Sequence, residues 1–221
     1  MLNTSPPSPP DTPLFNLPKA TQGLALTIIG MYLLQMFLPA ATKATLFGTL
    51  GFVPMHFTMF PPPSILNLLS PVTYMFIHAS ILHVVMNTLM LVAFGAGVER
   101  WLGSRNFLYL FFGTGIAAII VHFFYALIVD NMFGGYAMEQ AVIGASGATS
   151  GLFAVCMVYL QKMGMGIGAG PRGLLPLILV FIGISVVFGM TGSPDGNSVA
   201  WIAHIAGFLS GFIFLRLMKQ L

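Results

Sequence analysis

Charged residues are scarce in this chain. Of its 221 residues only 6% are Asp, Glu, Lys or Arg, whereas 57% are hydrophobic and the mean hydropathy is +0.93. A water-soluble domain carries charges at about a quarter of its positions. The composition therefore excludes a soluble globular protein and predicts an integral membrane protein.

Further absences narrow the class. The single cysteine, Cys156, excludes an internal disulfide and a metal site built from thiolates, and we interpret it as a small core residue. The absence of heptads and of alternating apolar and polar residues over ten-residue stretches favours a helical bundle over a membrane barrel. The eight basic residues lie scattered near the ends of apolar runs, so they indicate membrane topology rather than nucleic-acid binding.

Six apolar stretches organise the chain after a polar beginning. Residues 1–18 hold six prolines and no arginine, which predicts a disordered tail and neither a secretory signal nor a mitochondrial presequence. Residues 19–221 are expected to form one domain. Because all Lys and Arg beyond the tail except Lys43 fall on the side shared by the two termini, we expect both termini in the cytoplasm. The stretches expected to span the membrane are about residues 21–40, 80–99, 105–129, 146–161, 174–191 and 199–218.

The connection between the first two stretches is unusually long and apolar. Residues 41–79 include Phe47, Phe52, Phe57 and Phe60 and the triple proline Pro61–Pro63. Prolines and glycines would leave backbone groups unpaired in lipid, which disfavours a seventh span. We therefore predict an amphipathic, partly inserted first loop at the outer membrane interface.

A small, hydroxyl-rich segment opens the fourth apolar stretch. Ser146 lies in the sequence Gly144-Ala145-Ser146-Gly147, where glycine lets a backbone and a substrate approach the hydroxyl closely. Polar groups that enter hydrocarbon are costly, so a function is expected for them. On this segment alone, glycine packing with a cross-helix hydrogen bond from Ser146 is an equal alternative. Thr149 and Ser150 are rival nucleophiles, but both lie deeper in the helix.

Three further polar side chains lie at a similar depth below the outer surface. His83 and Asn87 are four residues apart and therefore share one helix face. His204 is followed by Gly207 and Gly211, which would let its helix approach the glycines that follow Ser146. His83 and Asn87 have an alternative role, since they could tie their helix to the first loop.

Together these residues have the chemistry of an acyl-transfer site. Ser146 is the candidate nucleophile and His204 the candidate general base. The candidate oxyanion donors are His83, Asn87 and the Ser146 backbone N–H, which lies at a helix N-terminus. Apart from Glu99 at the inner end of the second span, no acidic residue lies within a predicted span, so a Ser-His dyad with water as second substrate is expected, and neither a cofactor nor a metal.

The remaining polar residues have structural interpretations. We interpret His78 as part of the first loop, His122 as a structural residue within a span, and Glu99 with Arg100 as an interface anchor or a helix-capping pair. A zinc site is not expected. His78 and His83 are expected to point to different helix faces, and no His-Glu-x-x-His motif occurs.

Four motifs occur in an order that resembles the rhomboid family of intramembrane serine proteases. They are His83-x-x-x-Asn87, the run Gly-Ala-Gly-Val-Glu-Arg-Trp-Leu-Gly at 95–103, Gly-Ala-Ser-Gly-Ala at 144–148, and Ala-His-Ile-Ala-Gly at 203–207 with Gly211. The resemblance covers roughly residues 70–215. It implies an all-α, six-transmembrane-helix bundle with a long interfacial first loop. It also implies a Ser146 and His204 dyad, and His83 and Asn87 as oxyanion donors.

Two positions depart from the pattern of the family. Many rhomboids have an aromatic residue stacked on the catalytic histidine at the position of Ser150. Many bacterial members have a Trp-Arg pair in the first loop, which is absent here. We therefore expect His204 to be supported, and the first loop to be anchored, in another way.

The resemblance also implies a substrate class. We expect single-span membrane proteins to be cleaved within or beside their transmembrane helices, in the inner (plasma) membrane of a bacterium, with the lipid bilayer as the other partner and no nucleic acid. An inactive relative that binds transmembrane clients without cleaving them is the alternative. A small transporter is disfavoured, because no inverted repeat and no intramembrane carboxylate is evident.

Overall fold

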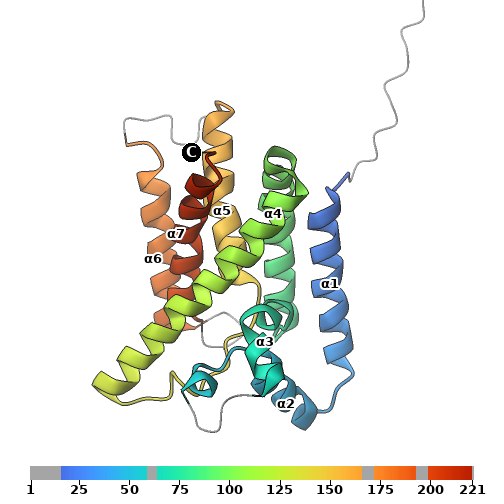
Figure 1. Cartoon of the computed structure of the whole chain (residues 1–221), viewed down its shortest axis with the longest axis vertical. Helices are drawn as coiled ribbons and strands as arrows, with labels where there is room; N and C mark the ends of the chain where they lie inside the picture. Colours follow the sequence, from blue (N-terminus) through green and yellow to red (C-terminus); the bar gives the residue numbers. More distant parts are fainter. Residues whose placement is uncertain (1–15, 59–63, 166–171, 193–198, 221) are drawn as a thin grey trace, which may run out of the picture.

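The computed structural model describes residues 16–58, 64–165, 172–192 and 199–220, and these residues are almost entirely helical. Five helices form a bundle, and two shorter helices lie across one end of it (Figure 1). The prediction of an all-α fold is confirmed. The bundle consists of α1 (Lys19–Met36), α4 (Ile81–Phe133), α5 (Ser146–Lys162), α6 (Leu175–Thr191) and α7 (Trp201–Leu217), and the short helices are α2 (Ala40–Leu50) and α3 (Ile65–Thr73).

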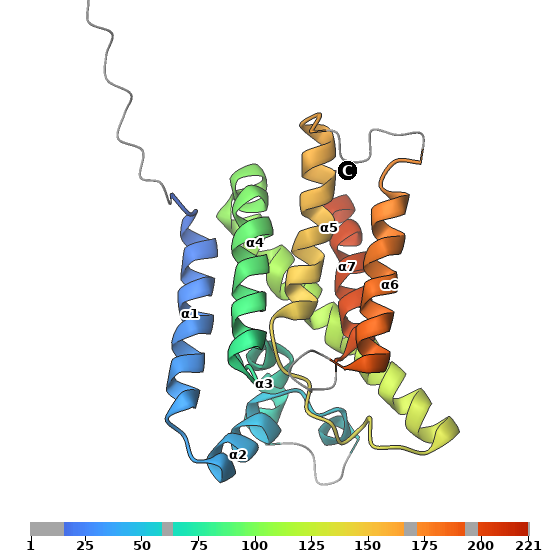
Figure 2. The same cartoon turned by 180° about the vertical axis from the view of Figure 1, so that it is seen from behind.

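Helix α4 is in fact two helices that meet at Gly103. This residue has φ +79° and ψ 155°, a conformation open to glycine and costly for other residues, so the chain turns sharply there. The second half then crosses the bundle diagonally (Figures 1 and 2). Helix α4 is long and apolar enough to cross a membrane, and its 53 residues exceed the roughly 20 that one crossing needs. The two halves coincide with the predicted stretches 80–99 and 105–129 to within a few residues.

The other predicted stretches also coincide with bundle helices to within a few residues. The bundle therefore has six helical segments where six spans are predicted. The predicted tail, residues 1–18, lies almost wholly outside the described residues. The first helix begins at Lys19, where the predicted domain begins.

Helix α1 is attached to the turn of α4 through one carboxylate. Glu99 is 3% exposed, and its two oxygens accept hydrogen bonds from the backbone N–H groups of Ala20 at 2.9 Å and Thr21 at 2.7 Å. The hydroxyls of Thr21 and Ser104 also donate to it, at 2.7 and 2.6 Å. These N–H groups belong to the first turn of α1 and have no partner within the helix. Of the two roles predicted for Glu99 with Arg100, an interface anchor or a helix-capping pair, Glu99 by itself caps a helix, and that helix is α1 rather than its own.

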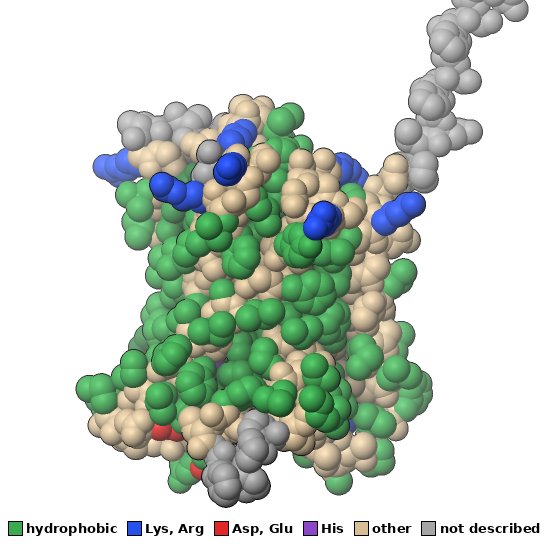
Figure 3. Space-filling model, in the orientation of Figure 1, with side chains coloured by type: hydrophobic (Ala, Val, Ile, Leu, Met, Phe, Trp, Pro, Cys, Tyr) green, Lys and Arg blue, Asp and Glu red, His purple; other side chains and the backbone are tan. Residues whose placement is uncertain are grey.

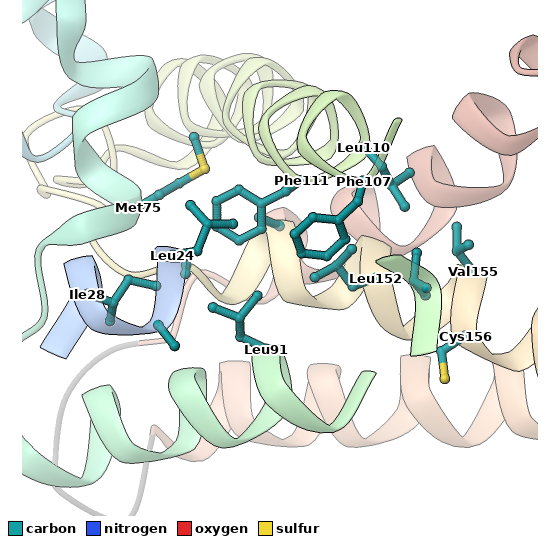
Figure 4. Close-up of a cluster of buried hydrophobic side chains, with 14 of the residues drawn as sticks. Leu24, Ile28, Met75, Leu91, Phe107, Leu110, Phe111, Leu152, Val155 and Cys156 are labelled. Carbon is teal, nitrogen blue, oxygen red and sulfur yellow. The ribbon is translucent and has the colours of Figure 1, made fainter. Parts of the chain in front are cut away.

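Helix α5 forms the centre of the bundle. Leu152 of α5 is fully buried with Leu91, Phe107 and Phe111 of α4 (Figure 4). Cys156, one turn further along α5, is 6% exposed and packs in the same cluster, as predicted for a small core residue. Burial of a large apolar side chain contributes roughly 1.5–3 kcal/mol relative to exposure in water. Between helices in a membrane, where lipid is as apolar as the side chains, close van der Waals packing provides much of the stabilisation instead.

The first loop lies at the end of the bundle where α5 and α7 begin. Helix α3 exposes much of its apolar surface, including Ile65, Leu68 and Leu69, as expected of a helix at a membrane interface. The loop is anchored by a short antiparallel bridge, in which Phe52 and Val142 exchange backbone hydrogen bonds of 2.9 and 2.8 Å. Residues Pro61–Pro63, on which the loop prediction partly rests, lie outside the described residues.

Charge is separated between the two ends of the bundle (Figure 3). We call the end that carries the start of α1 and the end of α7 the basic end. Asp130 lies near the end of α4, which is at the opposite end, and its carboxylate accepts backbone hydrogen bonds from Ala137 at 3.0 Å and Met138 at 2.8 Å. The residues at or next to the helix ends found there are Lys19, Arg100, Arg105, Lys162, Arg172, Arg216 and Lys219.

Candidate active site

Ser146 and His204 meet between α5 and α7. Ser146 is the first residue of α5, and His204 lies in the first turn of α7. The His204 Nε2 atom is 2.7 Å from the Ser146 Oγ atom, and both side chains are half-buried. An imidazole nitrogen at this distance can accept the hydroxyl proton, which is the first requirement for activating a serine.

Glycines bring the two helices close enough for this contact. A Cβ atom added to Gly207 of α7 would overlap the carbonyl oxygen of Gly147, and one added to Gly211 would lie 2.6 Å from the carbonyl oxygen of Gly151. The helices therefore touch backbone to backbone at two successive turns, as the glycine spacing predicts. The first of these contacts lies one turn after His204 and fixes the position of its ring relative to Ser146.

The opposite side of α5 packs equally closely against α4. A Cβ atom added to Gly151 would lie 2.5 Å from the Thr114 side chain, and one added to Gly147 would lie 2.8 Å from Ala118. Thr114 and Ala118 lie one turn apart in the second half of α4 and are fully buried. Glycines on α5 therefore allow close packing on two sides, and the N-terminal turn that carries Ser146 is held between α4 and α7.

The hydroxyls of the two rival nucleophiles point to the backbone of their own helix. The Ser150 hydroxyl donates to the Ser146 carbonyl oxygen at 2.7 Å, and the Thr149 hydroxyl donates to the same oxygen at 3.3 Å. Thr149 is fully buried and Ser150 is 3% exposed. Both hydroxyls are thus occupied and shielded, whereas the Ser146 hydroxyl meets an imidazole.

His83 lies against the backbone that leads into Ser146. Gly144 has φ +105°, and a Cβ atom there would lie 2.5 Å from the His83 Nε2 atom, so only glycine leaves room for the ring. The start of α4 is capped by Ser80, whose hydroxyl accepts the His83 backbone N–H at 3.1 Å. The cap and the glycine together hold the His83 imidazole against Gly144, which precedes Ser146 by two residues in the chain.

Asn87 lies one turn beyond His83 in the interior of the bundle. It is 4% exposed, and its Nδ2 atom donates to the His83 carbonyl oxygen at 2.9 Å. Its Oδ1 atom is buried without a hydrogen-bond partner. The amide has a second N–H that this hydrogen bond does not use.

The expected orientation of His78 is wrong. The His78 and His83 rings are in contact, with centroids 5.0 Å apart and planes at 69°. Helix α4 begins only at Ile81, so His78 precedes the helix and does not follow its face periodicity. Burial lowers the pKa of His78 to about 3, so its imidazole stays neutral. Within the described ranges, no group of three or more metal-binding side chains occurs.

Tyr74 is a contributor that the sequence analysis did not identify. Its hydroxyl donates to the Gly115 carbonyl oxygen at 2.8 Å, and its own carbonyl accepts the Gly144 N–H at 2.8 Å. It is 1% exposed and thus joins the first loop, α4 and the segment before Ser146. No motif marks this tyrosine, because its role depends on residues about 40 and 70 positions further along the chain.

Comparison with known proteins identifies the family. Residues 67–220 match the family model described as Rhomboid domain, which is more than half of the chain. The chain belongs to the rhomboid family. It is therefore an integral membrane protein with a rhomboid-like helical bundle, and its relatives include proteins named as serine proteases.

Individual relatives are distant and differ in length. The rhomboid chain is 30% identical over 151 residues to Rhomboid-like protein 15 of Arabidopsis thaliana, which covers 64% of this chain and 34% of the relative. It is 26% identical over 149 residues to Rhomboid protease GlpG of Haemophilus influenzae, a match that covers 67% of this chain and 71% of the relative. It is 27% identical over 138 residues to Rhomboid-type serine protease 2 of Emericella nidulans, which covers 62% of this chain and 24% of the relative. The matched region thus spans about a third or less of the plant and fungal relatives.

The structure accounts for both departures from the rhomboid pattern. Ser150 stands where many rhomboids have an aromatic residue, and its hydroxyl donates to the Ser146 carbonyl oxygen. The close contact of Gly207 with the Gly147 backbone instead positions α7, which carries His204. In place of a Trp-Arg pair, the first loop is held by the bridge between Phe52 and Val142. A hydrogen bond of 2.8 Å from the Met55 N–H to the Met138 carbonyl extends this attachment.

Proposed function

We propose that this rhomboid protein is an intramembrane serine endopeptidase that works through a Ser146 and His204 dyad. The distance of 2.7 Å between His204 Nε2 and Ser146 Oγ carries the proposal. It is supported by the burial of the two neighbouring hydroxyls and by relatives whose names include serine protease. No cofactor or metal enters the proposed reaction.

In the proposed reaction, His204 Nε2 takes the proton of the Ser146 hydroxyl while Oγ attacks the carbonyl carbon of the scissile peptide bond. The negative charge that forms on the carbonyl oxygen is stabilised by the Ser146 backbone N–H, His83 and Asn87. The protonated His204 then donates its proton to the leaving amine as the C–N bond breaks. Water, deprotonated by His204, attacks the acyl-serine ester; the bond from the acyl carbon to Oγ breaks, His204 returns the proton to Ser146, and the second product leaves with a carboxyl end.

The proposed substrates are single-span membrane proteins, which bind beside the bilayer-facing side of the bundle. An intact helix shields its carbonyl groups through hydrogen bonds, so a substrate must unwind locally before Ser146 can reach one. Gly or Pro near the cleaved bond weakens the helix and should favour cleavage. The proposed orientation places the basic end, and with it both termini, in the cytoplasm. A bacterial plasma membrane remains the predicted location.

The test uses the full chain reconstituted in liposomes with a fluorescent single-span substrate that carries a glycine near the outer end of its helix. We expect cleavage by the wild type and none above background by Ser146→Ala or His204→Ala. The matched controls are Thr149→Ala and Ser150→Ala, which should retain activity to within about tenfold. Cleavage that survives in Ser146→Ala would contradict the proposal. Binding of the substrate without cleavage by the wild type would favour the client-binding alternative.

A further inference from the structure

An apolar groove lies between the second half of α4 and the end of α7. Its volume is about 580 Å³, which is within the roughly 300–1,000 Å³ of pockets that hold small molecules. Leu108, Phe112 and Ile116 of α4 form one wall, and Phe214 and Met218 of α7 form part of the other. These residues lie toward the basic end, whereas Ser146 and His204 lie at the start of their helices toward the other end. The groove is therefore separate from the candidate active site.

The shape of the groove follows from one close contact. A Cβ atom added to Gly113 would lie 2.5 Å from the Phe214 ring, so α4 and α7 touch at this point. Because the second half of α4 crosses α7 diagonally, the helices diverge away from the contact (Figure 1). The distance along α4 from Arg105 to Ile116 is about 16 Å at 1.5 Å per residue, roughly half of the ~30 Å hydrocarbon core. The groove thus has at most the depth of one membrane leaflet.

A basic side chain is held on the wall of the groove. The Nε and Nη2 atoms of Arg105 both lie 3.3 Å from the hydroxyl of Tyr109, which lines the groove. The guanidinium carbon lies 5.5 Å from the centre of the Tyr109 ring. Arg105 is exposed, and the N–H groups of its Nη1 atom are suited to an anionic oxygen.

Two further basic residues lie at the end of α7, next in the chain to residues that line the groove. Arg216 and Lys219 are exposed and adjoin Leu217 and Met218, which line the groove. Lys219 has φ +56°, a conformation in which glycine is usual after a helix. It is the only described residue other than glycine with a positive φ.

The described acidic side chains lie away from this groove or are already bonded. Glu99 is buried and accepts four hydrogen bonds, and Asp130 and Glu139 lie near or after the end of α4, at the other end of the bundle. An anion would therefore gain attraction from Arg105, Arg216 and Lys219 without repulsion from these three carboxylates. A second copy of the chain docked through this face would instead bring like charges together.

We infer that the groove binds an anionic glycerophospholipid from the leaflet at the basic end. One acyl chain lies between α4 and α7, and the phosphate lies between Arg105 on one wall and Lys219 on the other. The acyl chain fills the space between α4 and α7 where the two helices diverge and do not contact each other. The headgroup contacts both the start of the second half of α4 and the end of α7. A zwitterionic lipid gains less, because its cationic group lies among basic side chains.

The test measures lipid binding by native mass spectrometry on the full chain in detergent. Phosphatidylglycerol and phosphatidylcholine with identical acyl chains are the probes. We expect one site that prefers phosphatidylglycerol. Each basic residue near a membrane surface contributes about fivefold to affinity for an anionic lipid, so the double variant Arg105→Gln with Lys219→Gln should bind phosphatidylglycerol about 25-fold more weakly. Ile116→Trp fills the groove and should weaken binding of both lipids.

The controls are chosen from the same chain. Lys43→Gln removes a basic residue at the other end, and Ile120→Trp adds the same bulk one turn further along α4, at a residue that is 52% exposed and does not line the groove. Neither should change binding. Equal affinity for the two lipids, or equal effects of the groove variants and their controls, would overturn the inference. So would a stable dimer whose formation Ile116→Trp abolishes, since the groove would then hold a second copy.

Discussion

Helices α5 and α6 have the same length, and although α6 is the more apolar of the two, α5 is the more buried. Each has 17 residues. In α5 eleven residues are buried, whereas in α6 only Ser185 is buried. The difference follows from side-chain size, because Gly147 and Gly151 let neighbouring helices approach α5, whereas α6 is lined by large residues such as Leu179 and Val187 that face outward.

The comparison indicates that α5 is held firmly in the bundle, whereas α6 is packed loosely. A nucleophile must be held within about 0.5 Å of its working position, and α5 is clamped between α4 and α7 at the turns that follow Ser146. Helix α6 packs mainly against α7 and has few buried contacts, which is typical of an element that can move. We therefore expect a substrate helix to reach the dyad beside the outer part of α6 and the first loop.

The largest expected effect is on turnover, in a variant of Asn87 that should change catalysis without changing stability. Asn87→Ala should reduce the turnover of a cleavable substrate by roughly 100- to 1000-fold, the usual result of removing one oxyanion donor. Stability should change little, because the hydrogen bond of Asn87 to the His83 carbonyl is confined to one helix. Turnover in liposomes and thermal unfolding in detergent measure the two effects. A variant that loses both together would show that Asn87 is structural.

The next effect tests the clamp on α5. Gly207→Ala should destabilise the protein by about 3 kcal/mol, the upper end of overpacking costs, because the added atom meets the Gly147 backbone and no rotamer change can relieve the overlap. Activity should fall as well, since α7 carries His204. The midpoint of thermal unfolding measures the first and substrate cleavage the second. An unchanged midpoint would mean that α5 and α7 are not in backbone contact.

A smaller effect is expected at α1, a peripheral helix that is attached by hydrogen bonds. Glu99→Gln should destabilise the protein by about 2 kcal/mol, because an amide cannot accept all four donors that the carboxylate accepts. Thermal unfolding of this variant is compared with that of Glu139→Gln, an exposed residue whose change should cost nothing measurable. Equal midpoints for the two variants would refute the capping role.

The smallest effect belongs to α6. A Cβ atom added to Gly183 has no neighbour within 4 Å, so Gly183→Ala should leave stability unchanged or raise it by up to about 1 kcal/mol through helix propensity. This is the opposite sign to Gly207→Ala for the same chemical change. A loss of stability above about 1 kcal/mol would show that α6 packs more closely than described and would remove the contrast with α5.

The sequence predicted those features of the fold and site that depend on residues close together in the chain. Apolar runs and charges determine the bundle helices, and the glycine spacing after Ser146 and His204 anticipates the contact between α5 and α7. The orientation of His78 was predicted incorrectly, because helix periodicity was applied to a residue that precedes the helix. The bridge between Phe52 and Val142 and the role of Tyr74 could not be predicted, since they join segments distant in the chain through backbone groups that every residue has.

The central claim is that Ser146 alone among the three neighbouring hydroxyls is activated, and that His204 activates it. The direct measurement treats the detergent-solubilised chain with a fluorophosphonate and locates the added mass by peptide mapping. The account predicts one adduct on Ser146 that is lost in His204→Ala and kept in Thr149→Ala and Ser150→Ala. An adduct on Thr149 or Ser150, or a Ser146 adduct that forms as fast without His204, would contradict it.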